Sequence, residues 1–126
     1  MTRRVVTTTG APSAIGPYSQ GIDTGSLVFV AGQIGREPDS GDMPDGVEAQ
    51  TERAMKNVGA ILDAAGLSWA DVVKTTCFLA DIADFETFNG VYKTFVTDPA
   101  PARSTFAVKD LPRGARVEVE AIAVRS

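Results

Sequence analysis

Hydrophobic and polar residues alternate along several short stretches of the chain, and a period of two residues is typical of half-buried β-strands. The same stretches are rich in Val, Ile, Phe and Thr, which favour strands. The pattern predicts six strands, over residues 3–9, 18–23, 26–33, 72–79, 103–108 and 116–124. Thr24 and Gly25 separate the second strand from the third, and this short connection predicts a hairpin.

A different spacing follows the third strand. Between Val47 and Ala65, apolar residues recur every three or four positions, which predicts an amphipathic helix. Gly66 comes next and is a residue type that commonly ends helices. Asp45 is the predicted N-cap, because Glu48 follows three residues later as in a capping box.

A second helix is predicted after Asp81, a residue type that commonly caps helix N-termini. Its apolar stripe consists of Phe85, Phe88, Tyr92 and Phe95, and we expect this stripe to pack in the core. Asn89 lies within the stripe, where a buried amide without partners would cost roughly 1 to 3 kcal/mol. The Asn89 side chain must therefore find hydrogen-bond partners.

The order of these elements predicts one α/β (α+β) domain over residues 1–126, with two helices on one face of a mixed sheet. The helices leave the opposite face of the sheet uncovered, and that face also carries apolar residues. Self-association is the most economical way to cover such a face.

Composition narrows the possible partners. Sixteen acidic against twelve basic residues give a net charge of −4, and no run of Lys or Arg offers a site for a phosphate backbone. No stretch of eighteen apolar residues and no apolar signal core are present in the sequence. We therefore expect a cytoplasmic protein that binds neither nucleic acid nor membranes.

The chain has no histidine and a single cysteine, Cys77. These counts exclude an intrachain disulfide, Ser-His-Asp and Cys-His catalysis, and histidine metal ligands. Cys77 lies in an apolar strand, which predicts a buried, inert thiol. Catalysis, if present, must use carboxylates, Lys, Arg, Tyr or water.

Two charged residues near the C-terminus do not look like ordinary surface charges. Arg103 opens a predicted strand just after Pro99 and Pro101, so its planar guanidinium has a stiff base and suits a carboxylate. Glu118 lies on a strand face that begins charged and then turns apolar. From the residues alone, a structural ion pair for Arg103 and a solvent-facing role for Glu118 remain alternatives.

Four motifs together resemble the RidA/YjgF family of reactive-intermediate deaminases. They are GPYSQ at 16–20, FVAGQI at 29–34, the helix around Asn89, and residues 101–124. The resemblance covers nearly the whole chain. It implies a chorismate-mutase-like fold and a homotrimer with a ligand cleft at each subunit boundary, and neither a cofactor nor a metal.

The implied reaction is hydrolysis of enamines or imines, such as 2-aminoacrylate and 2-iminopropanoate, to 2-keto acids and ammonia. By similarity, Arg103 would bind the substrate carboxylate and Glu118 would position or activate the attacking water. Further substrate-binding residues implied by the resemblance are Tyr18, Gly32, Asn89 and Thr105. A 2-imino acid already has an electrophilic carbon, so orientation and one placed water are sufficient.

The chain departs from many relatives at Ala31, where they carry serine, and at Thr105, where they carry cysteine. These positions bear on substrate preference. Tyr18 could instead be an interface aromatic residue, and Gly32 could simply permit a bulge. The alternative function is a trimer that binds or senses small carboxylates or 2-keto acids without catalysis. RNA cleavage is disfavoured because the chain lacks histidine and a basic patch.

Overall fold

The computed structural model describes residues 3–126. This part of the chain forms strands β1 (Arg4–Val6), β2 (Gly21–Asp23), β3 (Leu27–Ile34), β4 (Val72–Leu79), β5 (Ala102–Ala107) and β6 (Val117–Val124). The helices are α1 (Val47–Ala64) and α2 (Phe85–Tyr92), with short 3-10 turns at Trp69–Asp71, Ile82–Asp84 and Pro112–Gly114. None of the helices in the described residues is long and apolar enough to cross a membrane.

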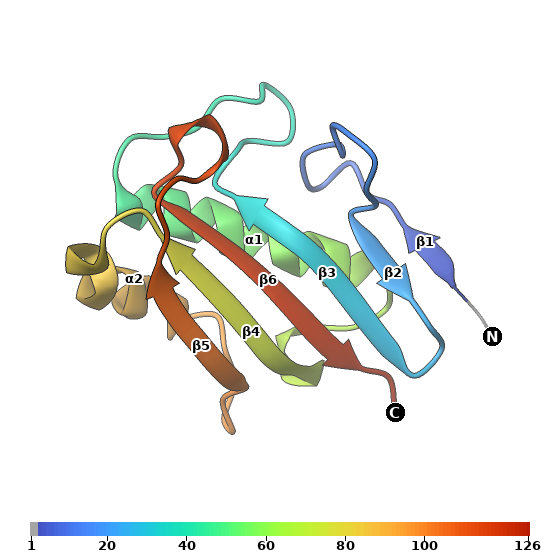
Figure 1. Cartoon of the computed structure of the whole chain (residues 1–126). Coiled ribbons are helices and arrows are strands. Elements are labelled where there is room, and N and C mark those ends of the chain that lie inside the picture. Colours follow the sequence, from blue (N-terminus) through green and yellow to red (C-terminus); the bar gives the residue numbers. More distant parts are fainter. Residues whose placement is uncertain (1–2) are drawn as a thin grey trace.

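The strands form one sheet in the order β1-β2-β3-β6-β4-β5. β4 and β5 run parallel, whereas the other neighbouring pairs within residues 3–126 are antiparallel. Both helices lie on the same face of this mixed sheet (Figure 1). The predicted α+β arrangement is therefore confirmed.

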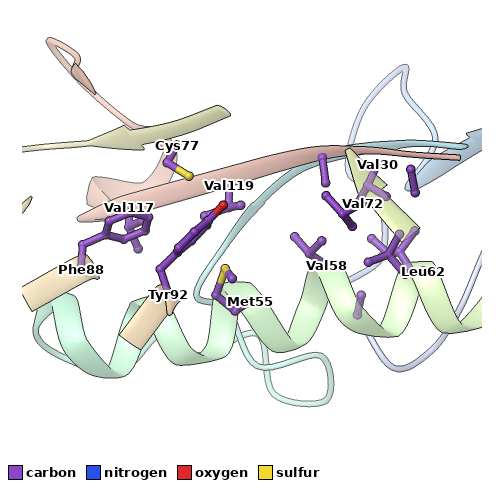
Figure 2. Close-up of a cluster of buried hydrophobic side chains, with 14 of the residues drawn as sticks. Val30, Met55, Val58, Leu62, Val72, Cys77, Phe88, Tyr92, Val117 and Val119 are labelled. Carbon is purple, nitrogen blue, oxygen red and sulfur yellow. The ribbon is translucent and has the colours of Figure 1, made fainter. Parts of the chain in front are cut away.

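The core fills the space between the sheet and the two helices. Figure 2 shows Val58 and Leu62 of α1 beneath the sheet, and Phe88 and Tyr92 of α2 farther along the same layer. Each buried aliphatic or aromatic side chain stabilises the fold by about 1.5 to 3 kcal/mol. Cys77 is part of this core, and burial raises the pKa of its thiol to about 11. The thiol is therefore neutral near pH 7, as an inert core residue requires.

The opposite face of the sheet is uncovered in the single chain. Phe29, Phe106 and Val124 point away from the helices and are 41%, 45% and 36% exposed. These exposed hydrophobic residues lie on β3, β5 and β6, on one face of the sheet, and form a surface that a partner can cover. We call this surface the open face.

The first two strands are shorter than the predicted 3–9 and 18–23. The buried Gln20 side chain accounts for the difference, because it bonds to the loop between them. Its Oε1 accepts from the Thr8 backbone N–H at 2.7 Å, and its Nε2 donates to the Pro12 carbonyl at 2.8 Å. Backbone N–H and C=O groups of this loop thus form hydrogen bonds with a side chain rather than with a neighbouring strand.

The predicted cap of α1 is wrong. Gly46, not Asp45, occupies the N-cap position, with φ 87° and no side-chain hydrogen bond. The buried Gln50 side chain holds the helix start instead. It donates to the Pro44 carbonyl at 2.9 Å and accepts from the Arg116 backbone N–H at 2.8 Å.

The predicted cap of α2 is wrong, because Asp84 occupies the N-cap position of that helix without a side-chain hydrogen bond. Asp81 instead caps the 3-10 turn that precedes α2. Its Oδ1 accepts from the Ala83 backbone N–H at 2.9 Å and begins the 3-10 turn Ile82–Asp84, which leads directly into α2. This entry sets the direction of α2, and so places its stripe of aromatic residues against β4 and β5.

Candidate active site

The two predicted catalytic residues lie on opposite faces of the sheet. Arg103 pairs with the buried Thr75 across β4 and β5, and its side chain lies under α2. Glu118 alternates along β6 with the fully buried Val117 and Val119, so its side chain lies on the open face. A single chain therefore does not bring the two groups together.

Arg103 is held by an amide and by aromatic rings. Its Nη1 donates to Asn89 Oδ1 at 2.8 Å. The guanidinium carbon lies 4.8 Å from the ring centre of Tyr92, and 5.6 and 5.8 Å from those of Phe85 and Phe88. Such cation–π contacts attract the charge without neutralising it.

No carboxylate within residues 3–126 pairs with Arg103, since the ion pairs there involve other residues. The guanidinium is thus oriented by neutral groups and keeps its full charge for an anion from outside the chain. It lines a cavity of about 500 Å³ together with Asn89 and Tyr92, which we call the Arg103 cavity.

The Tyr92 ring that faces Arg103 is itself fixed. Its hydroxyl lies 2.7 Å from the buried Thr75 Oγ1. Burial raises the pKa of the Tyr92 phenol, so it stays protonated near neutral pH. Tyr92 is therefore a rigid, neutral support for the guanidinium.

Glu118 lines a separate cavity of about 270 Å³, the Glu118 cavity, together with Tyr18 and Gly32. Gly32 lies in a bulge of β3 where the register with β6 shifts between Val30 and Gln33. A Cβ at Gly32 would overlap the Glu118 carboxylate, with the carboxyl carbon only 2.9 Å away. The bulge therefore allows the Glu118 carboxylate to lie against bare backbone, whereas a substrate-binding role for Gly32 stays a prediction.

The Glu118 carboxyl is half-buried and has no ion-pair partner within the described residues. Burial raises its pKa above the ordinary value, and the nearby Glu120 raises it further. A carboxylate with a raised pKa is a better proton acceptor than an exposed one. Among residues 3–126, no group of three or more His, Cys, Asp or Glu side chains could hold a metal ion.

Tyr18 and Thr105 differ in their surroundings. Tyr18 is 52% exposed at the wall of the Glu118 cavity, and its Oη accepts weakly from the Ile15 backbone N–H at 3.4 Å. Thr105 pairs with Cys77 on the face that holds Arg103. Its hydroxyl is buried without a hydrogen-bond partner in the described structure. A substrate-binding role for either residue stays a prediction.

Residues 8–125 match the model of a protein family described as Endoribonuclease L-PSP. The chain belongs to this family. A mouse relative, named 2-iminobutanoate/2-iminopropanoate deaminase, is 50% identical over 124 residues, which is 98% of this chain and 92% of the relative. The relatives agree with the enzyme class predicted from the sequence.

Two solved structures are also closely similar to this chain. E. coli TdcF with bound serine is 47% identical with a TM-score of 0.94, and the match covers 98% of this chain and 99% of TdcF. The E. coli YjgF gene product is 44% identical with a TM-score of 0.93, covering 98% and 99%. The predicted resemblance to the RidA/YjgF family is therefore confirmed.

In this L-PSP family member, the aromatic stripe has a second role that the apolar pattern does not predict. Phe85, Phe88 and Tyr92 were expected to pack only in the core, but they also surround the Arg103 guanidinium. The signal was the polar Asn89 within the stripe, which required a partner on the same side. Arg103 is that partner.

Proposed function

We propose that this chain is a deaminase that hydrolyses 2-imino acids and their enamine tautomers to 2-keto acids and ammonia. The observation that carries the proposal is Arg103, a guanidinium oriented by Asn89 and three rings but left without a carboxylate among the described residues. The high identity to proteins named imine deaminases supports the same reaction. Substrates of the 2-aminoacrylate and 2-iminopropanoate type fit this chemistry.

The complete site is proposed to form between two copies of the chain. Arg103 and Glu118 lie on opposite faces of one sheet, so a site that needs both must take one from each copy. The open face supplies apolar surface for this contact. A ring of three copies in a chorismate-mutase-like fold would create three equivalent sites without leaving an uncovered face.

In this site Arg103 would bind the carboxylate of the 2-imino acid. A planar guanidinium can donate two parallel hydrogen bonds to a carboxylate, which fixes both position and orientation. The Asn89 oxygen accepts a hydrogen bond from Arg103 Nη1, so the guanidinium is already oriented before the substrate binds. The substrate carbon would then be presented to the Glu118 side of the boundary.

Glu118 would act on the attacking water. As the water oxygen bonds to C2, the carboxylate accepts one water proton and returns it to nitrogen. As the C–N bond breaks and its electron pair leaves with nitrogen, the carboxylate accepts the hydroxyl proton and passes it to the departing ammonia. Starting from the iminium form, one water is consumed, and one 2-keto acid and one ammonium ion are released. A half-buried carboxyl with a raised pKa suits both transfers.

The test is keto-acid release from 2-aminoacrylate, generated in place by a serine dehydratase, with and without the protein. The proposal predicts acceleration over the buffer reaction. Tight binding of 2-keto acids without any acceleration would overturn it and favour the non-catalytic binding trimer.

The family description names an endoribonuclease, but the residues favour the deaminase. The chain carries a net charge of −4 and no histidine. Phosphate backbones are bound by extended arrays of cations, and Arg4, Arg53, Arg116 and Arg125 are paired with acids.

Gly32→Ala tests the placement of Glu118. The added methyl overlaps the carboxylate, so the Glu118 side chain must move away from the cavity wall. We expect kcat to fall by about 10²-fold, since misplacement by 1 Å costs about that much. Gly90→Ala is the matched control for the glycine-to-alanine change, because a Cβ there meets nothing within 4 Å and Gly90, like Gly32, has no positive φ. A Gly32→Ala enzyme with the parent rate would contradict this placement.

Tyr92 variants test the support beneath Arg103. Tyr92→Phe keeps the ring and loses only the bond to Thr75, whereas Tyr92→Leu also loses the cation–π contact. We expect KM to rise only slightly for Tyr92→Phe and about tenfold for Tyr92→Leu, because such contacts contribute about 0.5 to 2 kcal/mol. Equal KM values for the two variants in steady-state kinetics would show that the ring does not position Arg103.

A further inference from the structure

Two more arginines line the Glu118 cavity. Arg36 lies in the segment between β3 and α1, and Arg113 lies in the 3-10 turn before β6. Neither forms an ion pair with Glu118 or with any other carboxylate in residues 3–126. Their positive charge is therefore not used within the described structure.

Only some of the described arginines lack a carboxylate partner. Of the other described arginines, those that pair with carboxylates are Arg4, Arg53, Arg116 and Arg125. Apart from the exposed Arg3, the arginines without carboxylate partners are Arg36, Arg103 and Arg113, and all three line the two cavities. In an acidic chain with sixteen carboxylates, unpaired guanidiniums gathered at cavities indicate sites for an external anion.

The backbone at Arg113 supports a functional reading. This residue has φ 58° and ψ 24°, the left-handed region that favours glycine, and Gly114 beside it has φ 67°. Residues with side chains that are held in this region cluster at ligand-binding and catalytic sites. The conformation places an exposed arginine at the wall of a cavity rather than along a strand.

Arg36 is oriented by a backbone bond. Its Nε donates to the Gly41 carbonyl at 3.3 Å, which leaves the two terminal nitrogens for another acceptor. The side chain is half-buried at the cavity wall, so its charge is screened less than that of a fully exposed residue. Both arginines thus give the lining of the Glu118 cavity a positive character.

The inference rests on the proposed function. We propose that Arg36 and Arg113 form an anion subsite for the substrate side chain, so that this enzyme prefers 2-imino acids with a second carboxylate. Arg103 of a neighbouring copy would bind the carboxylate on C2, and the two cavity arginines would bind the distal one. Such imines arise by oxidation or dehydration of acidic or hydroxy-acidic amino acids.

The size of the cavity is consistent with this substrate. A water takes up about 30 Å³, so a cavity of about 270 Å³ accommodates a four-carbon dicarboxylate together with the attacking water. Apolar residues, including Ile15 and Ile34, line other parts of the same cavity. Neutral imino acids would therefore still be hydrolysed, but with lower kcat/KM.

The test compares the imines made from aspartate and asparagine by amino-acid oxidases with catalase present. These substrates have nearly the same shape and differ in one negative charge. We expect kcat/KM for the aspartate-derived imine to exceed that for the asparagine-derived imine by about tenfold or more, the effect of one charge-assisted hydrogen bond. Arg36→Gln and Arg113→Gln should each lower this ratio several-fold, and the double variant should bring it close to one.

Controls separate a local subsite from general electrostatics. Lys109→Gln removes one exposed positive charge that lines neither cavity. The ratio of kcat/KM for the two imines should be the same in this variant as in the parent. Arg36→Lys and Arg113→Lys keep the charge and should retain most of the preference. A parent ratio near one, or a ratio unchanged in the double Gln variant, would overturn the subsite. Hydrolysis of 2-aminoacrylate but of neither imine would also overturn the subsite, whereas failure of the parent with 2-aminoacrylate as well would overturn the proposed function.

Discussion

Arg103→Ala is expected to abolish most of the deaminase activity. The variant loses the bond to the substrate carboxylate, and removing one partner of a desolvated charge pair costs about 2 to 5 kcal/mol. This corresponds to a decrease in kcat/KM of roughly 30-fold to several thousand-fold. Both KM and kcat should change, because the carboxylate contact also aligns the substrate carbon with the water.

Arg103→Lys separates charge from geometry. Lysine keeps the positive charge but lacks the planar guanidinium, which can donate two parallel hydrogen bonds and is oriented by Asn89 and the aromatic rings. We expect it to recover only a small part of the lost activity. Arg3→Ala, at an exposed arginine outside both cavities, is the control for loss of charge. Parent-level kcat/KM in a folded Arg103→Ala protein would show that Arg103 does not bind substrate.

Glu118→Gln is expected to lower kcat by about 10²- to 10⁴-fold, the usual contribution of a general acid–base group. Glutamine has nearly the same shape and can still hydrogen-bond a water, but it cannot accept a proton. KM should change little, since the substrate carboxylate is bound by Arg103. Glu120→Gln, at the exposed acid two residues along the same face, is the matched control and should keep most of the activity. Similar losses in both variants would remove the special role of Glu118.

The raised pKa of Glu118 predicts opposite effects of pH on activity and stability. Activity should rise with pH through the raised pKa, as the carboxyl ionises and can accept a proton. The folded chain binds this proton more tightly than the unfolded chain does, so the carboxyl costs stability as pH rises from 4.5 through the folded pKa. Glu118→Gln cannot ionise, so its Tm relative to the parent should increase over this interval and then stay constant.

The fold could be predicted from the sequence because its periodic patterns are long. The eight-residue strand Val72–Leu79 was predicted at its exact bounds, and α1 was predicted to within one residue at its end. Prediction was poorest where a single side chain replaces regular structure. The Gln20 side chain forms long-range hydrogen bonds to the loop between β1 and β2, so that β1 ends earlier and β2 begins later than predicted. No local sequence pattern reveals these bonds.

The candidate site could be predicted only as a set of residues. The alternation of buried and exposed residues along β6 shows which of its side chains share a face. It does not show that the Arg103 side chain, on β5, lies on the opposite face, the one that α2 covers. The separation of Arg103 from Glu118 therefore required the sheet order and the β4–β5 register. Arg36 and Arg113 were not predicted either, because they lie in irregular segments that meet only in the folded chain.

The division of the site between two copies can be tested directly by complementation. Arg103→Ala and Glu118→Gln proteins, each nearly inactive alone, are unfolded, mixed in equal amounts and refolded, and keto-acid release from 2-aminoacrylate is measured. Each site takes Arg103 from one copy and Glu118 from the next, so random assembly into a closed ring restores about one quarter of the sites. The account predicts activity near one quarter of the parent value. A refolded mixture that assembles like the parent but is no more active than the two separate variants would contradict it.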